Sequence, residues 1–540
     1  MKIKDILITL GGFLFSYLFY QQEPGINLTV FSIYIIACLA MLYPQAPKNS
    51  NWWLAAGALL IASGCMAWYS NALCFFATLF SWVLLSAYTF RHNEAALLNF
   101  IQGGFSLVLS VPKFFKGLYL GRLRKSKKEG AMVKNILVYV LITGVLFIFL
   151  ILYANASSVF GEFLQQIDLS FISFGWLFVA VVGFFIMHGL VKHRRLKAAD
   201  YYEKKLSAPL AAPTGIFAII TDKLKLENKA GTLLLALLNL LLLMVNISDI
   251  VFLSQGQEDF EPGKYHELVH QGVGALIFSI ILAVVILLYF FRGKLNFHPG
   301  AKNLRTLAYL WMAQNIVLVA TAAIKNGIYI QAFDGLTYKR VGVYYFLLLC
   351  AIGLVITVVK LYAKKPNWYL VRTNFTAFFI VMIASCLVDW DAIIMKYNFR
   401  NALFNNKYGD PDMLYLSQFS PQSILPVAEW VIERTNNPNI AHPYDEHEFA
   451  RIGQRIKNSY HHLETKYANG WQSFSYKGYN TYRQLSEMPL DSIRGMEYIH
   501  YRDSLEAATE WAEAARVADS AWRADSALKA DTTQQLINDK

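Results

Sequence analysis

Charged residues are scarce in this chain. Only 16% of its 540 residues are Asp, Glu, Lys or Arg, and 56% are hydrophobic, whereas a soluble domain carries about 25% charged residues. The deficit comes from long apolar runs, which exclude a large soluble core and indicate a membrane protein. A cleavable signal peptide is not expected, because the first apolar run continues into further runs without a small-residue cleavage site.

Cysteine is also rare, and its spacing excludes the common thiol motifs. The five cysteines are Cys38, Cys65, Cys74, Cys350 and Cys386. All of them lie in apolar runs, and none has CxxC or zinc-ligand spacing. This pattern favours small buried hydrophobic side chains over a metal or redox motif.

The apolar runs predict an all-α polytopic membrane protein. A helix needs about 20 mostly apolar residues to cross a bilayer. We expect eleven spans, at residues 5–20, 26–43, 52–69, 71–90, 133–153, 171–191, 230–253, 271–291, 304–324, 343–362 and 371–391.

Lysine and arginine predict the orientation of these spans. If the N-terminus is cytoplasmic, the inner segments hold 28 Lys and Arg and the outer loops hold four. Positive residues concentrate on the cytoplasmic side of membrane proteins. We therefore expect a bacterial inner-membrane protein with a cytoplasmic N-terminus and a periplasmic C-terminus. Its net charge of +12 is then explained by anionic lipid at the cytoplasmic face, with no need for nucleic acid.

Three regions follow from these patterns. Residues 1–391 form the expected transmembrane domain. Its segment 91–132 is cytoplasmic and interfacial, because the apolar stretch 95–119 contains Gly and Pro and is flanked by basic residues, which suits an interfacial or re-entrant helix. Residues 392–517 form an expected extracytoplasmic helical domain that meets a periplasmic protein partner. Residues 518–540 contain the repeat "ADSAWRADSALKADT" and are expected to be solvated or disordered.

Polar side chains inside the expected spans are candidate functional residues. Asn239, Asn246 and Asp249 are spaced by seven and three, which places them on one helical face. Asp389 and Asp391 lie near the outer end of the last span. These residues either line an ion or solute path or form hydrogen bonds between helices, and the sequence leaves both interpretations open.

The segment "HELVH" matches the HExxH pattern of zinc metalloproteases. In that pattern His266 and His270 bind the metal and Glu267 is the general base. The extended form fails, because Val273 and Leu276 replace its Gly and third His. Asp334 lies in a loop on the same side and is the one available third ligand. We expect no cofactor and regard the segment as an interfacial helix start, with a zinc site as the alternative.

Four segments resemble a bacterial polytopic family known only as domain of unknown function number four-one-seven-three. They read "LLLALLNLLLLMVNISDIVFL", "KYHELVHQGVGALI", "NGIYIQAFDGLTYKRVGVY" and "VDWDAIIMKYNFR" followed by "DPDMLYLSQFSPQSILP". The resemblance covers roughly residues 215–430. It implies a membrane role and supplies neither a reaction nor catalytic residues.

These observations favour a non-enzymatic scaffold or sensor component of the membrane. The long polar C-terminal region and the short outer loops support this function. The alternatives are a solute or ion transporter that uses the polar residues of the seventh and eleventh spans, and a membrane zinc metalloprotease that uses "HELVH". The sequence does not specify a substrate, a partner or an oligomeric state.

Overall fold

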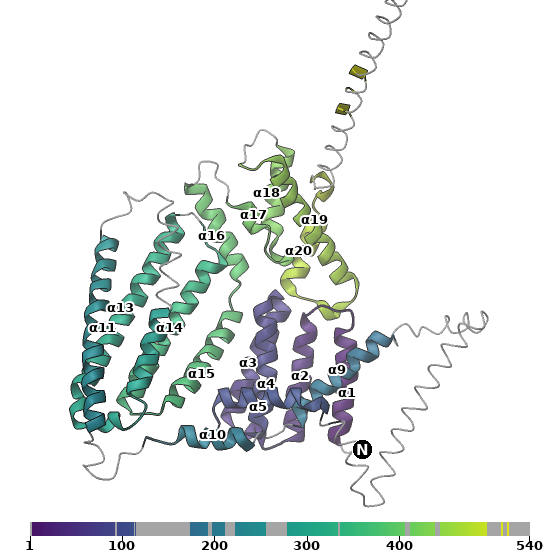
Figure 1. The fold of residues 1–540 in the computed structure, drawn as a ribbon. Helices are drawn as coiled ribbons and strands as arrows, with labels where there is room; N and C mark the ends of the chain where they lie inside the picture. Colours follow the sequence, from purple (N-terminus) through teal and green to yellow (C-terminus); the bar gives the residue numbers. More distant parts are fainter. Residues whose placement is uncertain are drawn as a thin grey trace, which may run out of the picture. The chain divides into compact units, whose positions relative to one another are not determined.

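The computed structural model describes residues 3–91, 94–112, 114, 173–192, 197–210, 222–254, 278–332, 335–405, 411–437 and 443–493, with five residues between 509 and 517. All regular elements in these ranges are helices (Figure 1). The first helices are α1 (Ile3–Phe19), α2 (Ile26–Leu42), α3 (Ser50–Tyr69), α4 (Ala72–Phe90), α5 (Ala96–Val108), α9 (Phe174–Val191) and α10 (Lys197–Ser207).

The second half of the chain continues in the same way. Its helices are α11 (Asp222–Ser254), an unlabelled helix at Phe278–Phe290, α13 (Lys302–Ala332), α14 (Tyr338–Tyr362), α15 (Asn367–Cys386), α16 (Trp390–Asn405), α17 (Met413–Leu416), α18 (Leu425–Asn436), α19 (Glu446–Ala468) and α20 (Tyr476–Ser486). The chain divides into two compact units. The first contains residues 1–394 and 466–477, and the second contains residues 395–465 and 478–540.

Two apolar cores lie among the described residues of the first unit. One core joins α1, α2, α3, α4 and α9, and side chains from the end of α15 complete it. The other joins α11, the helix at Phe278–Phe290, α13 and α14. Helix α15 packs on α14 and also on α3, α4 and α5, so it connects the two bundles.

Small residues allow α1 and α9 to approach closely. A Cβ atom on Gly12 would lie 2.8 Å from the carbonyl oxygen of Ala180, and one on Gly183 would lie 2.4 Å from Cβ of Phe15. Close backbone approach at glycine is typical of membrane helices, where packing rather than the hydrophobic effect drives association.

The all-α polytopic membrane architecture is confirmed. Among the described residues, seven helices are long and apolar enough to cross a membrane: α3, α4, α9, α11, α13, α14 and α15. Helices α1 and α2 coincide with two further expected spans and have 17 residues each. The expected span at 133–153 and the start of the one at 271–291 lie outside the described residues, so the count of eleven stays a prediction.

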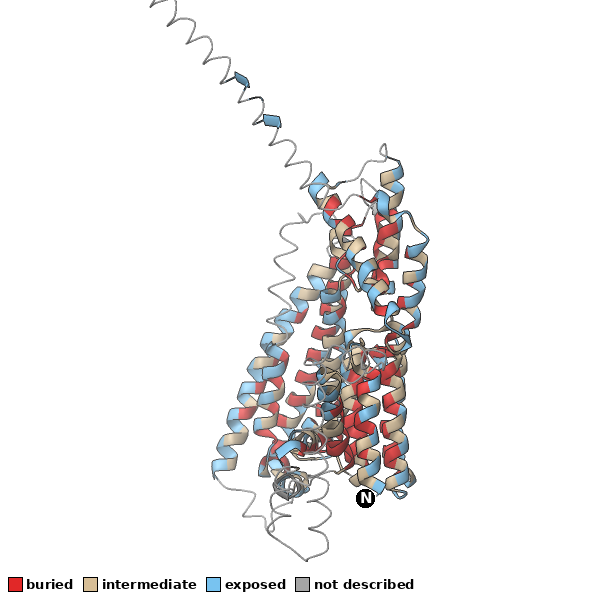
Figure 2. Ribbon diagram, turned by 90° about the vertical axis from the view of Figure 1, so that its right-hand side faces the viewer, coloured by how far each residue is buried: buried red, intermediate tan, exposed pale blue. Residues whose placement is uncertain are grey.

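Helix α11 shows the surface that lipid requires. Large apolar side chains remain exposed along it, while its buried positions are Gly231, Leu235, Asn239 and Asn246. Figure 2 shows that the helices of the chain carry both buried and exposed positions along their lengths. The exposed set includes Leu233, Leu237, Leu240, Leu241, Leu243, Met244 and Ile247. An apolar face of this length is stable only in contact with hydrocarbon or another protein.

Two short helices differ from the spans in direction. Helices α5 and α10 run across the spans rather than along them (Figure 1). At 13 residues, α5 is about 20 Å long by the usual helical rise, which is shorter than the hydrocarbon core of about 30 Å. It lies within the stretch 95–119 that we expected not to cross.

The eleventh expected span ends earlier than predicted. Helix α15 ends at Cys386, and α16 begins at Trp390. Asp389 therefore lies in the connection between α15 and α16, and Asp391 lies in the first turn of α16. Neither residue lies within a span, although the predicted span extended to residue 391.

The second unit is helical in its described part. Its apolar core includes Ile424, Val427, Val431, Ile452 and Ile456, all of which are fully buried. A helical C-terminal region was expected. The boundaries at 391 and 517 remain predictions, and residues 518–540 lie outside the described ranges.

Candidate functional site

A line of polar side chains joins α11 to α13, and we call it the polar seam. It contains Asn239, Asn246 and Asp249 from α11 and Gln314, Thr321 and Lys325 from α13. The members on α13 are spaced by seven and four, so each helix presents its polar residues on one face. The face predicted for Asn239, Asn246 and Asp249 thus meets a matching face of α13.

Amide groups form the middle of the polar seam. Asn239 Nδ2 donates to the carbonyl oxygen of Leu307 at 3.0 Å, and Gln314 Nε2 donates to Asn239 Oδ1 at 3.0 Å. Asn246 Nδ2 donates to the carbonyl oxygen of Gln314 at 3.1 Å. Among the described residues, no donor reaches Asn246 Oδ1 or Gln314 Oε1. These bonds hold two spans together and leave two buried acceptors unsatisfied, each of which costs free energy.

One end of the polar seam carries an ion pair. Lys325 Nζ lies 2.5 Å from Asp249 Oδ1, and Thr321 Oγ1 donates to Asp249 Oδ2 at 3.1 Å. The Asp249 side chain is 15% exposed and that of Lys325 is 29% exposed. Charged residues in membrane helices are usually paired and functional. Lys325, which the sequence interpretation had placed in a loop, therefore belongs to this site.

A second polar cluster holds residues 466–477, which we call the anchor segment. This segment connects α19 to α20 and belongs to the first unit, although the chain on both sides of it belongs to the second unit. Gly470 turns the segment with φ of +121°, a backbone conformation that only glycine adopts without strain. Residues Trp471–Ser473 then form a single 3-10 turn.

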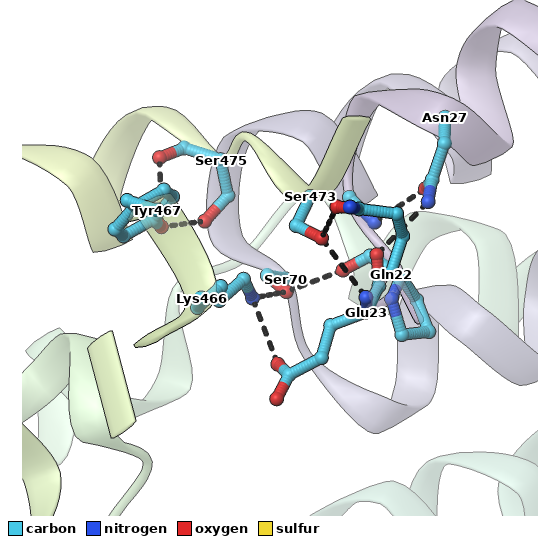
Figure 3. A network of polar contacts seen from close by, with 10 residues as sticks. Gln22, Glu23, Asn27, Ser70, Lys466, Tyr467, Ser473 and Ser475 are labelled. Carbon is cyan, nitrogen blue, oxygen red and sulfur yellow. Dashed lines mark hydrogen bonds and ion pairs between the residues drawn. The ribbon is translucent and has the colours of Figure 1, made fainter. Parts of the chain in front are cut away.

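The start of the anchor segment is held by a buried lysine. Lys466 Nζ lies 3.4 Å from Glu23 Oε2 and donates to Ser70 Oγ at 3.2 Å (Figure 3). Its side chain is only 4% exposed, while that of Glu23 is 43% exposed. Burial lowers the pKa of Lys466, and the charge of Glu23 opposes that shift. Ser70 in turn donates to the carbonyl oxygen of Pro24 at 3.0 Å.

The α1–α2 turn receives the middle of the anchor segment. Ser473 Oγ accepts from the Glu23 backbone N–H at 2.9 Å and donates to Gln22 Oε1 at 2.7 Å. The Ile26 N–H donates to the carbonyl oxygen of Phe474 at 2.8 Å. Figure 3 shows Gln22, Glu23 and Ser473 meeting at this turn. A Cβ atom at Gly25 would lie 2.6 Å from the carbonyl oxygen of Phe474, so the close contact requires glycine.

Asn27 makes the α1–α2 turn rigid. It is fully buried, and its Oδ1 accepts from the N–H groups of Gly25 and Leu28 at 2.8 and 2.9 Å. Its Nδ2 donates to the carbonyl oxygens of Leu18 and Glu23, both at 2.9 Å. The turn is therefore pre-organised to receive the anchor segment.

The other end of the anchor segment is held by Lys477. Its Nζ lies 2.8 Å from Asp389 Oδ2 and 3.0 Å from Asp389 Oδ1. One residue earlier, Tyr476 stacks on Trp68 with ring centroids 4.5 Å apart. Asp389, predicted as a polar membrane residue, thus contacts the anchor segment. Asp391 accepts a hydrogen bond from Tyr338 Oη.

The candidate zinc residues His266, Glu267, His270 and Asp334 all lie outside the described residues. Within the described ranges, no group of three or more His, Cys, Asp or Glu side chains is arranged to hold a metal ion. The zinc alternative therefore remains a prediction.

The sequence interpretation missed the partners of both clusters. Lys325 could have been found, because it ends a span on the same predicted side as Asp249. Lys466 carried no comparable signal, since it lies 443 residues from Glu23 in an ordinary amphipathic helix. Only the tertiary structure brings that pair together.

Comparison with known proteins identifies a family. A protein-family model described as "Domain of unknown function (DUF4153)" matches residues 10–430. The resemblance drawn from the motifs was to the family numbered four-one-seven-three and covered only 215–430, so the number and the extent are corrected. No curated protein and no solved structure matches the chain significantly.

Proposed function

Because the chain belongs to the DUF4153 family and folds as a polytopic membrane protein, we propose that it is a non-enzymatic scaffold or sensor component of the bacterial inner membrane. In this proposal the C-terminal region meets a protein partner in the periplasm. One observation carries the proposal: the anchor segment is fixed at both ends, by Lys466 on Glu23 and by Lys477 on Asp389. A fixed insertion of this kind suits a region that presents a binding surface or transmits a change of position.

The charge distribution supports an orientation. The helix ends opposite to the anchor segment carry Lys4, Lys48, Lys192, Lys364 and Lys365. Basic residues favour the cytoplasmic side and anionic lipid. The proposed topology therefore has a cytoplasmic N-terminus, a periplasmic anchor segment and a periplasmic C-terminus.

Cysteine labelling tests this orientation. In a chain whose five native cysteines are replaced, Tyr479→Cys and Tyr201→Cys each introduce one thiol at an exposed position. In intact spheroplasts, a membrane-impermeant maleimide is expected to label the first variant and to spare the second until the membrane is permeabilised. Labelling of Tyr201→Cys alone before permeabilisation would reverse the orientation.

Photo-crosslinking in living cells tests the scaffold function. A benzoylphenylalanine at position 479 is expected to give a discrete protein adduct, whereas the same residue at position 201 does not give that adduct. The Glu23→Gln variant is expected to weaken the adduct, because it disturbs the anchor segment. The scaffold proposal fails if position 479 gives no adduct in the wild-type chain at normal expression.

The polar seam favours a transporter as the second candidate function. Its Asp249–Lys325 pair and unsatisfied amide oxygens are groups that can bind or release a small cation or proton. Purified protein in proteoliposomes should then dissipate an imposed sodium or proton gradient, and Asp249→Asn should abolish that flux. A flux equal to that of empty liposomes removes this candidate.

Metal analysis decides the protease alternative. Stoichiometric zinc that is lost in the His266→Ala/His270→Ala variant would replace the scaffold proposal with a metalloprotease. Purified protein without zinc after growth in zinc-supplemented medium would eliminate the protease alternative.

A further inference from the structure

We propose that Cys65 and Cys74 are a thiol pair that forms a reversible disulfide by exchange with a disulfide oxidant. The site stands independently of the scaffold function proposed above. It is a modification site at the end of the first bundle where α3 turns into α4.

Three spans bring cysteines together at this point. Cys65 lies one turn before the end of α3, Cys74 lies in the first turn of α4, and Cys386 is the last residue of α15. The Cys74 thiol interacts electrostatically with the thiols of both Cys65 and Cys386. It also donates to the carbonyl oxygen of Cys386 at 3.8 Å. Thiols from distant parts of the sequence thus share one cluster, whereas sequence spacing alone suggested five independent buried cysteines.

The α3–α4 turn favours the pairing of Cys65 with Cys74. Ser70 adopts a left-handed conformation with φ of +54° and ends α3. The Asn71 side chain then accepts from the Cys74 N–H at 2.8 Å and starts α4. The two helices therefore run antiparallel from a fixed turn, and they pack along their lengths. Cys65 lies four residues before the end of α3 and Cys74 is the third residue of α4, so the two cysteines lie on opposite sides of the same turn.

Burial distinguishes the two possible pairs. Cys74 and Cys386 are fully buried, while Cys65 is partly exposed. An oxidant therefore reaches Cys65 first. The Cys386 thiol also donates to the carbonyl oxygen of Met382 at 3.3 Å within its own helix. These contacts make Cys65 the attacking thiol and Cys74 the resolving thiol.

The exchange proceeds in two balanced steps. The Cys65 thiol loses its proton to solvent and attacks the oxidant RSSR; one S–S bond breaks, a mixed disulfide forms on Cys65, and RS⁻ leaves and takes up a proton. The Cys74 thiol then loses its proton and attacks Cys65 Sγ, which forms the Cys65–Cys74 bond and releases a second RSH. The chain loses two electrons, which the oxidant gains as two thiols.

Peptide mapping of the full-length protein tests the pair. The reduced protein is treated with oxidised glutathione, denatured and alkylated with N-ethylmaleimide. It is then cleaved with chymotrypsin, because no Lys or Arg separates the two cysteines, whereas Trp68 and Tyr69 do. We expect three alkylated cysteines in place of five and one linked peptide pair that contains Cys65 and Cys74.

Three variants sharpen the result. Cys74→Ser is expected to retain a glutathione adduct on Cys65, because the resolving thiol is absent. Cys350→Ser removes a half-buried cysteine from a different span and should leave the linked pair intact. Cys386→Ser should also leave it intact. Five alkylated cysteines after oxidation, or a peptide that links Cys74 to Cys386, would overturn the proposal.

Discussion

The Lys466–Glu23 pair allows one prediction to be worked out in detail. We expect Glu23→Gln to destabilise the anchor segment far more than Lys466→Met, although both changes break the same ion pair. The reason is the unequal burial of the two side chains, at 4% exposed for Lys466 and 43% for Glu23. Removing the exposed partner leaves a buried charge, whereas removing the buried partner leaves a solvated one.

The magnitudes follow from the contacts. Glu23→Gln leaves the buried ammonium with the Ser70 hydroxyl as its neutral partner, and an uncompensated buried charge costs about 3 kcal/mol. Lys466→Met loses a half-exposed ion pair, worth at most about 1 kcal/mol, and a hydrogen bond worth about 1 kcal/mol. It also removes the cost of burying the charge. The net change for Lys466→Met should stay within about 1 kcal/mol.

Hydrogen exchange measures this difference directly. The Ile26 and Glu23 amides donate to the anchor segment, so their protection reports its docking free energy. Glu23→Gln should lower their protection about 100-fold, since each 1.4 kcal/mol is a factor of ten. Glu464→Gln is the matched control, because it neutralises a similarly exposed carboxylate on α19, the helix that carries Lys466. Equal losses of protection in Glu23→Gln and Lys466→Met would refute the reasoning.

The same lysine predicts a pH dependence. Burial lowers the pKa of Lys466 in the docked state below its ordinary value of 10.5. Between the two pKa values the released state binds more protons, so docking becomes more stable as the pH rises. After correction for intrinsic exchange rates, protection of the Ile26 amide should increase as the pH approaches 10.5. Lys466→Met should abolish this slope, and an unchanged slope would assign it to another group.

The remaining predictions concern other contacts of the first unit. Asp249→Asn or Lys325→Met alone should lower the free energy of unfolding by about 3 kcal/mol, because each leaves a largely buried charge without its partner. The double variant Asp249→Leu/Lys325→Met should recover most of this loss. Denaturant titration in micelles checks whether the double variant is more stable than either single variant. Gly25→Ala should cost about 1–3 kcal/mol, because its Cβ would meet backbone oxygens at 2.6 Å; faster exchange of the Ile26 amide is the expected sign, and unchanged exchange contradicts it. Lys360 is fully buried and donates to the carbonyl oxygen of Phe291 at 3.0 Å. This oxygen lies just after the end of a helix, where a cation is favoured. Lys360→Met should therefore lower the midpoint of thermal unfolding, and a midpoint at or above that of the wild type would show that the charge is not stabilising.

Much of the fold could be predicted, because the bilayer imposes simple requirements. A span needs about 20 apolar residues with internally satisfied backbone groups, so the runs at 52–69 and 71–90 coincide closely with α3 and α4. The run at 230–253 lies within α11, which begins earlier, at Asp222. The residues at which helices end were harder to predict from the sequence. Asp389 looked like part of a span because the apolar run continues close to it, whereas its side chain accepts from the Ala392 N–H at 3.1 Å and begins α16.

The sequence by itself determined that the chain crosses the membrane repeatedly as helices, and that Asn239, Asn246 and Asp249 share a helical face. Periodicity and hydropathy are local properties, so each segment carries them alone. The tertiary structure decided which groups meet across long distances in the chain: Asp249 with Lys325, Glu23 with Lys466, and Cys74 with Cys386. Such pairings depend on how whole helices pack and turn, and a single sequence records the members of a pair without recording that they are partners.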